Sequence, residues 1–121
     1  MNLSDKQKQI VDHINGALLV KAGPGSGKTR VLTERVKHLL SATMRGKVVA
    51  LTFSNMAAEE MRTRLEKDPE VGDAIERVNV STIHSFCLDL IQSRGNLVGL
   101  RHDVALFEND ADRCLFFVAF L

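Results

Sequence analysis

Cysteine and long apolar runs are scarce in this chain, and their scarcity argues against several classes of protein. The 121 residues include two cysteines, Cys87 and Cys114, and neither belongs to a CxxC or Cys/His pattern. Isolated thiols argue against a zinc site and fit a reducing cytosol, and we expect both in the core. The N-terminus is polar and has no signal-peptide segment, and no apolar run approaches the length of a membrane span. We therefore expect a cytoplasmic protein with no membrane partner.

The overall composition is that of an ordinary globular domain. Hydrophobic residues make up 45% of the chain and charged residues 26%. The net charge of +1 neither supports nor excludes nucleic-acid binding, because it describes the whole chain and no one face. No repeat or low-complexity segment is present. Local motifs must therefore indicate the function.

The most informative motif lies at residues 22–29, which read AGPGSGKT. This is the A/G-xxxx-GK-S/T pattern of a loop that cradles phosphate groups. An apolar run before it predicts a buried parallel strand at about 17–22, and apolar residues at helical spacing follow it. Three glycines, Gly23, Gly25 and Gly27, are expected to turn the backbone so that successive N–H groups point into one concavity. A nucleoside triphosphate is the ligand that this arrangement predicts.

Each remaining residue type of the loop has a physical role. Lys28 places a positive charge near the β and γ phosphates and is the predicted catalytic residue. Thr29 offers a hydroxyl to Mg²⁺, Pro24 stiffens the loop, and the following helix adds its positive dipole end. Ala22 stands where the strict motif has glycine. The alternative is a glycine-rich turn with an incidental lysine. The predicted nucleotide-binding residues in this loop are Ala22, Gly23, Pro24, Gly25, Ser26, Gly27, Lys28 and Thr29.

Strands alternate with helices along the chain, which predicts a parallel α/β sheet. Ser4 and Gln7 form a capping-box pattern for a first helix that Gly16 ends. Ser54 or Asn55 can cap a later one. The remaining expected elements are helices at 28–40, up to about 67 and at 85–93, and strands at 48–53 and 78–83. Ligands bind beyond the carboxyl ends of parallel strands. We therefore expect the phosphate loop, 53–55 and 82–85 to share one face.

The last eight residues, CLFFVAFL at 114–121, are apolar without interruption. A helix that is hydrophobic on every side has to be buried on every side. Two interpretations remain open: a helix separated from its partners, or a surface for self-association.

Four stretches together resemble the N-terminal part of the first motor subdomain of UvrD/Rep-like superfamily 1A DNA helicases: LSDKQKQIV, AGPGSGKTRVL, TFSNMAAEEMRTRL and STIHSFCLDLI. The resemblance covers about residues 3–93, in order and spacing as well as in residue type. It implies a P-loop NTPase (RecA-like) fold, ATP and Mg²⁺ as ligands, and single-stranded DNA as partner. It also implies an incomplete subdomain over 1–105 and the start of an inserted helical subdomain over 106–121, with the remainder of the helicase chain as a partner.

The resemblance also assigns residues to the ATP site. Gln7 matches a glutamine whose amide recognises adenine, which is plausible because a carboxamide presents both a donor and an acceptor. Its alternative role is the capping box, and one amide is not expected to fill both roles at once. Arg30 follows Thr29 as it does in the family, either in a functional role or as a residue of the helix surface.

A second group of residues matches segments that lie along DNA in this family. Phe53 could stack on a base and Asn55 could bond to phosphate or base. The alternatives are a core residue and a helix cap. Thr82, His84 and Ser85 match a further DNA-facing motif, although a lone histidine is more often structural. Two residues depart from the pattern: Ser54 replaces a common Thr, and Met56 replaces a common Lys, which removes an expected phosphate contact.

Hydrolysis in this class also needs an Asp and a Glu at the end of a later strand, and no hydrophobic strand here ends in that pair. The arginine fingers and the second motor subdomain are absent as well. We therefore expect an N-terminal fragment that binds ATP without hydrolysing it. The alternatives are the motor of a helicase–nuclease and a non-catalytic nucleotide-binding or interaction module that associates through 114–121. A small-molecule kinase would need an arginine-rich lid and an acceptor site, and neither is visible.

Overall fold

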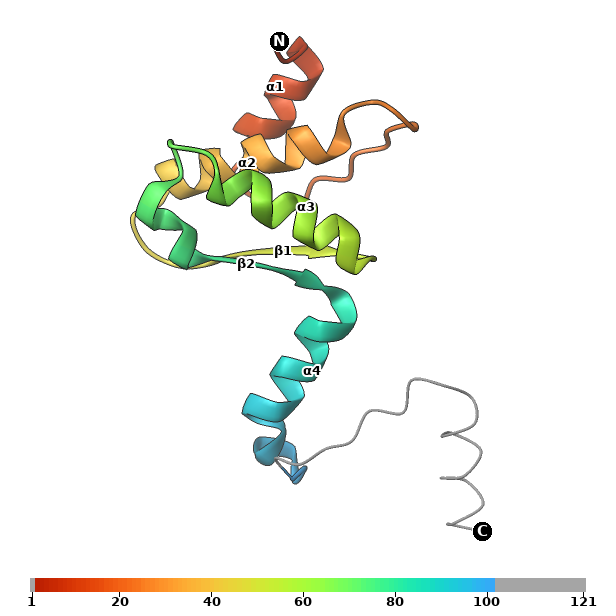
Figure 1. Cartoon of the computed structure of the whole chain (residues 1–121), viewed down its shortest axis with the longest axis vertical. Helices are drawn as coiled ribbons and strands as arrows, with labels where there is room; N and C mark the ends of the chain where they lie inside the picture. Colours follow the sequence, from red (N-terminus) through yellow and green to blue (C-terminus); the bar gives the residue numbers. More distant parts are fainter. Residues whose placement is uncertain (1, 102–121) are drawn as a thin grey trace. The chain divides into compact units, whose positions relative to one another are not determined.

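The computed structural model describes residues 2–101, in which helices alternate with two strands (Figure 1). The two strands pair in parallel, with Val48 opposite Val78 and Thr52 opposite Thr82. The predicted parallel α/β organisation is therefore confirmed. In chain order the elements are α1 (Asp5–Asp12), α2 (Lys28–Ala42), β1 (Val48–Thr52), α3 (Asn55–Glu66), η1 (Gly72–Arg77), β2 (Val78–Thr82), α4 (Ile83–Arg94) and η2 (Gly95–Val98).

The chain divides into two units, one ending at Ile83 and the other beginning at His84. In the first unit α2 and α3 lie on the same side of the two-stranded sheet (Figure 1). Their apolar faces meet the sheet in one cluster, in which Leu65 is fully buried. Val49 and Leu51 alternate onto the opposite face of β1 and remain partly exposed. The buried members of the cluster are Val36, Leu40, Ala58, Met61, Leu65, Val71 and Val80.

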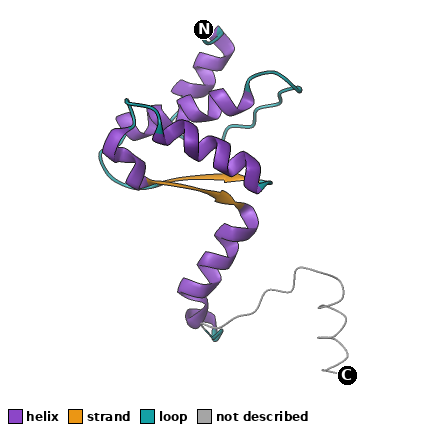
Figure 2. Cartoon of the chain, in the orientation of Figure 1, coloured by secondary structure: helices purple, strands orange, loops and turns teal. Residues whose placement is uncertain are grey.

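The strand predicted at 17–22 is wrong for this chain. Figure 2 draws the whole connection between α1 and α2 as loop, and Leu19 is 85% exposed. The reason lies in the backbone, because a strand forms only where a neighbour takes up its N–H and C=O groups. Within residues 2–101 the one ladder joins β1 to β2, and the apolar run at 17–22 is paired with neither strand.

The predicted helix boundaries agree closely with the structure where a cap determines them. Ser4 accepts a hydrogen bond from the Gln7 N–H, and the reciprocal bond completes the capping box. Ser54 is the N-cap of α3 and accepts from the Ala57 N–H at 3.2 Å. The helix after β2 begins at Ile83, directly from the strand and two residues earlier than predicted.

The second unit has few buried residues over its described part. None of the α4 side chains is buried, and Cys87 is exposed. The expectation of a core position for Cys87 is therefore wrong, because among residues 84–101 its helix has no apolar layer to pack against. Cys114 and the whole of 114–121 lie outside the described residues. No helix within 2–101 is both long and apolar enough to cross a membrane.

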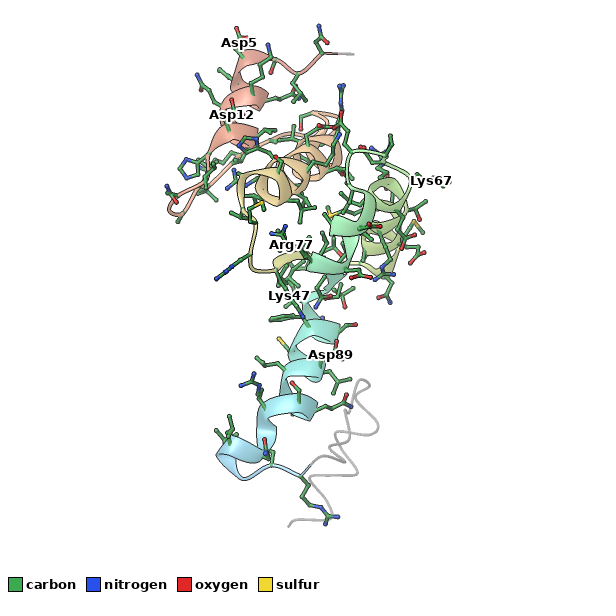
Figure 3. The ribbon with its side chains drawn as sticks, turned by 90° about the vertical axis from the view of Figure 1, so that its left-hand side faces the viewer. Asp5, Asp12, Lys47, Lys67, Arg77 and Asp89 are labelled. Carbon is green, nitrogen blue, oxygen red and sulfur yellow. The ribbon has the colours of Figure 1, made fainter. Side chains whose placement is uncertain are left out.

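Arginine side chains hold the first unit together through main-chain carbonyls. Arg77 donates to the Thr43 carbonyl at 2.6 Å and to the Gly46 carbonyl at 3.0 Å, and so ties the end of η1 to the turn before β1. Arg77 and Lys47 are labelled beside that turn in Figure 3. Arg62 of α3 donates to the Val80 carbonyl of β2 at 2.6 Å. These bonds satisfy carbonyls at the end of α2, in the turn and in β2.

A lysine surrounded by carboxylates links α2 to the turn after α3. Lys37 Nζ lies 2.8 Å from Asp68, 2.8 Å from Glu70 and 3.3 Å from Glu34. Burial acts to lower the pKa of Lys37, but its hydrogen bonds to Asp68, Glu70 and Glu34 outweigh burial and raise it. The hydrogen bond from Lys37, with one from the Glu70 N–H, lowers the pKa of Asp68. The cluster therefore stabilises the folded state while the carboxyls are ionised.

Replacing Lys37 by methionine should destabilise the fold in a pH-dependent way. At neutral pH the Lys37→Met variant should unfold at a lower temperature, because three carboxylates would face one another without a cation. Since the pKa of Asp68 is depressed in the folded state, its contribution is present above its unfolded pKa of about 4 and is lost as the pH falls through its folded pKa. The difference in unfolding temperature between Lys37→Met and wild type should therefore become smaller toward pH ~3.

Thermal unfolding followed by circular dichroism at neutral and acidic pH measures both effects. Lys67→Met is the matched control, because Lys67 is exposed and directly precedes Asp68 in the sequence. This role of Lys37 would be contradicted by an equal fall in unfolding temperature in Lys67→Met. A difference between Lys37→Met and wild type that does not change with pH would contradict it as well.

Candidate functional site

The glycine-rich loop turns through the left-handed region at two of its three predicted positions. Gly25 has φ 71° and Gly27 has φ 79°, which are conformations that side chains disfavour. Gly23 does not have a left-handed φ, so the prediction for this residue is wrong. A Cβ built on Gly23 or Gly25 would meet no heavy atom within 4 Å, so open space adjoins the loop there.

Hydrogen bonds within the loop close its turn. Ser26 Oγ donates to the Gly23 carbonyl at 2.6 Å, and the Ser26 N–H donates to the same carbonyl at 3.4 Å. Lys28 Nζ donates to the Ala22 carbonyl at 3.4 Å, which folds the ammonium back over the loop. The charged group predicted to meet phosphates therefore lies against the backbone that would cradle them.

The loop leads directly into the N-terminus of α2. Gly27 is the N-cap residue and provides no side-chain cap, and Lys28, Thr29 and Arg30 form the first turn. The first N–H groups of a helix have no partner within the helix and carry the positive end of its dipole. An anion is their natural partner at the start of a helix of 15 residues.

Gln7 connects α1 to this loop. Its Oε1 accepts from the Ser4 N–H at 2.9 Å, and its Nε2 donates to the Ser26 carbonyl at 3.2 Å. A carboxamide has two acceptor sites and two N–H donors. One of each is used by the protein and one of each is left, so the capping box and a further ligand can be served together. The count of sites leaves room for both roles, and the adenine role of Gln7 stays a prediction.

A cleft of about 770 Å³ adjoins the loop, between α1, the segment after it and the start of α2. Ile10, Leu18, Val20 and Leu32 give it apolar walls, and Lys28 lies in its lining. The sequence placed 18–20 inside a buried strand, and so missed them as cleft residues. The clue was the capping-box helix just ahead, whose Ile10 could meet the same apolar run.

A triphosphate fits the donor set of this loop. The open space at Gly25, the N-terminus of α2 and the Lys28 ammonium suit a ligand of high negative charge. For a metal ion the loop region offers only the Thr29 hydroxyl. The described part of the chain has no group of three His, Cys, Asp or Glu residues placed to hold a metal. A bound Mg²⁺ would thus need oxygens from the phosphates themselves.

The residues after the end of β1 are exposed. Phe53 is 91% exposed, which rules out its alternative role as the last core residue of the strand. Ser54 caps α3, so Asn55 is not the cap and its side chain is exposed at the first helical position. Met56, where the family commonly has lysine, is also exposed.

The residues at the end of β2 differ in exposure. Thr82 pairs with Thr52 in register, so the carboxyl ends of both strands meet at one sheet edge. Its side chain is only 7% exposed and is not presented to a ligand. His84 and Ser85 are exposed in the first turn of α4, in the second unit.

A parallel sheet, flanking helices and a glycine-rich loop at a helix N-terminus define an α/β chain with a candidate phosphate site. Residues 3–119 match the family described as UvrD/REP helicase N-terminal domain, and the chain belongs to this family. It is 37% identical over 109 residues to the ATP-dependent DNA helicase PcrA of Staphylococcus aureus. It is 39% identical over 116 residues to the ATP-dependent DNA helicase UvrD1 of Mycobacterium tuberculosis. These matches cover 88% and 93% of this chain, but 15% of each relative.

Two glycines of the loop should respond differently to the same substitution. Gly27→Ala should lower the free energy of unfolding by about 1 kcal/mol, because an alanine strains a left-handed backbone. The added Cβ would also lie 3.5 Å from Gln7 Nε2. Gly23→Ala should change stability little, since neither φ nor space opposes it. Urea unfolding measures both, and equal losses would contradict the loop geometry.

Proposed function

We propose that this chain is the N-terminal ATP-binding part of an ATP-dependent DNA helicase that translocates on single-stranded DNA. The carrying observation is the loop AGPGSGKT at the N-terminus of α2, with left-handed glycines and a returning lysine, in a chain of this family. The proposed architecture is a P-loop NTPase (RecA-like) sheet that is incomplete here, over 1–105. Residues 106–121 would begin an inserted helical subdomain, outside the described residues.

In the proposed complex the loop holds the triphosphate of ATP. Backbone N–H groups from Gly25 to Thr29 meet phosphate oxygens, and the Lys28 ammonium exchanges the Ala22 carbonyl for the terminal phosphates. This exchange costs little, because a charged phosphate is a stronger acceptor than a main-chain carbonyl. Lys28 would neutralise charge that develops during phosphoryl transfer and is therefore the proposed catalytic residue.

Gln7 would read the base. Its remaining N–H and acceptor site match N7 and the N6 amino group of adenine, whereas guanine presents acceptors at both positions. The adjoining apolar cleft supports a planar base close to this amide. Arg30, in the first turn of α2, is proposed to assist nucleotide binding.

The proposed Mg²⁺ ligand from this chain is the Thr29 hydroxyl. Bound between the phosphates and this hydroxyl, the ion would supply charge neutralisation for phosphoryl transfer. The main-chain carbonyl of Thr29 accepts a hydrogen bond from Thr33 Oγ1 at 2.8 Å. That bond lies in the first turns of α2 and helps to order the residue that presents the hydroxyl.

Single-stranded DNA is the proposed second ligand, at the carboxyl ends of the strands. Phe53 offers an exposed ring for stacking and Asn55 an exposed amide for phosphate or base, which are sequence-tolerant contacts. His84 and Ser85 are proposed as further contacts. For Thr82 the proposal is limited to its main chain, since its side chain is buried.

The chain alone is proposed to bind ATP without turning it over. Its sequence has no hydrophobic strand ending in an Asp and Glu pair, which hydrolysis in this class requires. The missing groups would come from the remainder of a helicase chain in the cytoplasm. Two alternatives remain: the motor of a helicase–nuclease, and a non-catalytic interaction module that self-associates through 114–121.

Lys28→Ala should weaken binding of ATP with Mg²⁺ at least ~10-fold, because the variant loses a charge-assisted contact of roughly 1.5–3 kcal/mol. Isothermal titration calorimetry on the 121-residue chain and the variant measures the affinities. Phosphate release in the presence of single-stranded DNA should be no greater for wild type than for the variant. Equal ATP affinities would refute the nucleotide site, and turnover above the variant would refute the proposed incompleteness.

A further inference from the structure

Gln7 makes a hydrogen bond to the phosphate loop that recognition of adenine does not require. Its Nε2 donates to the Ser26 carbonyl, 19 residues away in the phosphate loop. The same nitrogen lies 3.5 Å from the position that a Cβ on Gly27 would occupy, so the amide packs closely against the next residue of the loop. The amide is therefore placed against the peptide unit that joins Ser26 to Gly27.

That contact orients a main-chain donor. None of the described peptide bonds is cis, so the Ser26 carbonyl and the Gly27 N–H point in opposite directions from one plane. When Gln7 holds the carbonyl, the Gly27 N–H is directed away from the amide of α1. Gly27 has a left-handed φ of 79°, and its own carbonyl accepts from the Val31 N–H at 3.0 Å. The Ser26–Gly27 peptide is thus held by α1, and the Gly27–Lys28 peptide that follows it is held by α2.

Gln7 is itself held firmly enough to act on the loop. Its Oε1 accepts from the Ser4 N–H, and its own N–H donates to Ser4 Oγ at 3.3 Å. Both bonds belong to the capping box at the start of α1. The far end of α1 is secured to α2, because the Arg35 guanidinium donates to the Ile10 carbonyl. The side chain therefore extends from a helix whose start is capped and whose last turn is bonded to α2 (Figure 3, where Asp5 and Asp12 mark the two ends of α1).

Other contacts of the loop are made within the loop itself. The bonds from Ser26 to Gly23 close the turn internally, and the Lys28 bond to Ala22 is one that a phosphate would replace. Since the 17–22 segment is not in a sheet, it does not fix the entry into the loop. The Gln7 bond to Ser26 links the loop to a separate helix, α1.

We propose that Gln7 is a positioning residue for the phosphate-binding loop, in addition to any contact with a base. It holds the Ser26 peptide so that the Gly27 N–H is already directed for a phosphate oxygen, and it couples the two ends of a bound nucleotide. The inference rests on the proposed nucleotide site and adds that Gln7 affects ligands that have no base.

Inorganic tripolyphosphate is the probe that separates the two roles, because it has the phosphates of ATP and no adenine. Gln7→Met keeps the side-chain length and removes both hydrogen-bonding groups. It should weaken tripolyphosphate binding about 5-fold, the effect of one hydrogen bond, and ATP binding more strongly. Affinities are measured by calorimetry on the 121-residue chain with Mg²⁺.

Ser4→Ala is the control for a merely structural effect. It removes the Ser4 Oγ half of the capping box and weakens the end of α1. The Gln7 bonds to the Ser4 N–H and to the Ser26 carbonyl remain. This variant should bind tripolyphosphate as wild type does. In the ligand-free chain, amide exchange at 25–27 should be faster in Gln7→Met than in Ser4→Ala.

The possible results separate the positioning role of Gln7 from the proposed nucleotide site on which that role rests. Weaker tripolyphosphate binding in Gln7→Met alone supports the positioning role. Wild-type tripolyphosphate affinity together with weaker ATP binding would show that Gln7 reads only the base, and would overturn the inference while leaving the proposed function. Equal losses in both variants would assign the effect to the helix end. No binding of tripolyphosphate or ATP by wild type would overturn both.

Discussion

The pairing of backbone groups between strands is the constraint on which this structure depends. β1 and β2 satisfy each other in a parallel ladder, and α2 and α3 cover one face of that ladder. Residues 17–22 have the apolar character of a strand and no neighbour among residues 2–101 to pair with. The loop that follows is consequently not held by a sheet. Its shape depends on the helices at its two sides, α1 through Gln7 and α2 through the Gly27 cap.

This arrangement separates a stable part of the first unit from a part that is built around the ligand site. The stable part is the Leu65 cluster. The ion pairs between Lys37 and its neighbouring carboxylates reinforce it, as do the hydrogen bonds from Arg77 to main-chain carbonyls. The ligand part consists of an exposed phosphate loop held by single hydrogen bonds and an adjoining cleft with apolar walls. Apolar burial contributes most to stability, whereas open N–H groups and an exposed ammonium attract an anion. Helix α2 contributes to both parts: Val36 packs in the core, and Lys28 lies at the ligand site.

Local signals allowed much of this to be predicted from the sequence. The sequence predicts Ser4 as a cap and leaves the second cap open between Ser54 and Asn55, because a side-chain oxygen satisfies N–H groups a few residues away, which is a short-range effect. The strand at 17–22 was predicted wrongly because its apolar pattern reports a tendency to be buried, while pairing depends on a distant segment. The same limit explains Cys87, whose helix has no apolar layer over it among the described residues of its unit. The contact of Gln7 with Ser26 links two motifs 19 residues apart, and no local pattern contains it.

The central claim is that a triphosphate binds at the loop between α1 and α2 through main-chain N–H groups oriented by Gly27 and Gln7. The most direct test is a two-dimensional NMR titration of the isotopically labelled 121-residue chain with ATP and Mg²⁺. The account predicts that the largest shifts fall on the amides of 23–29 and on the side-chain amide of Gln7. The amides of the Leu65 cluster should change little. Shifts centred on other residues, or no shifts at any ATP concentration in the titration, would contradict this binding site.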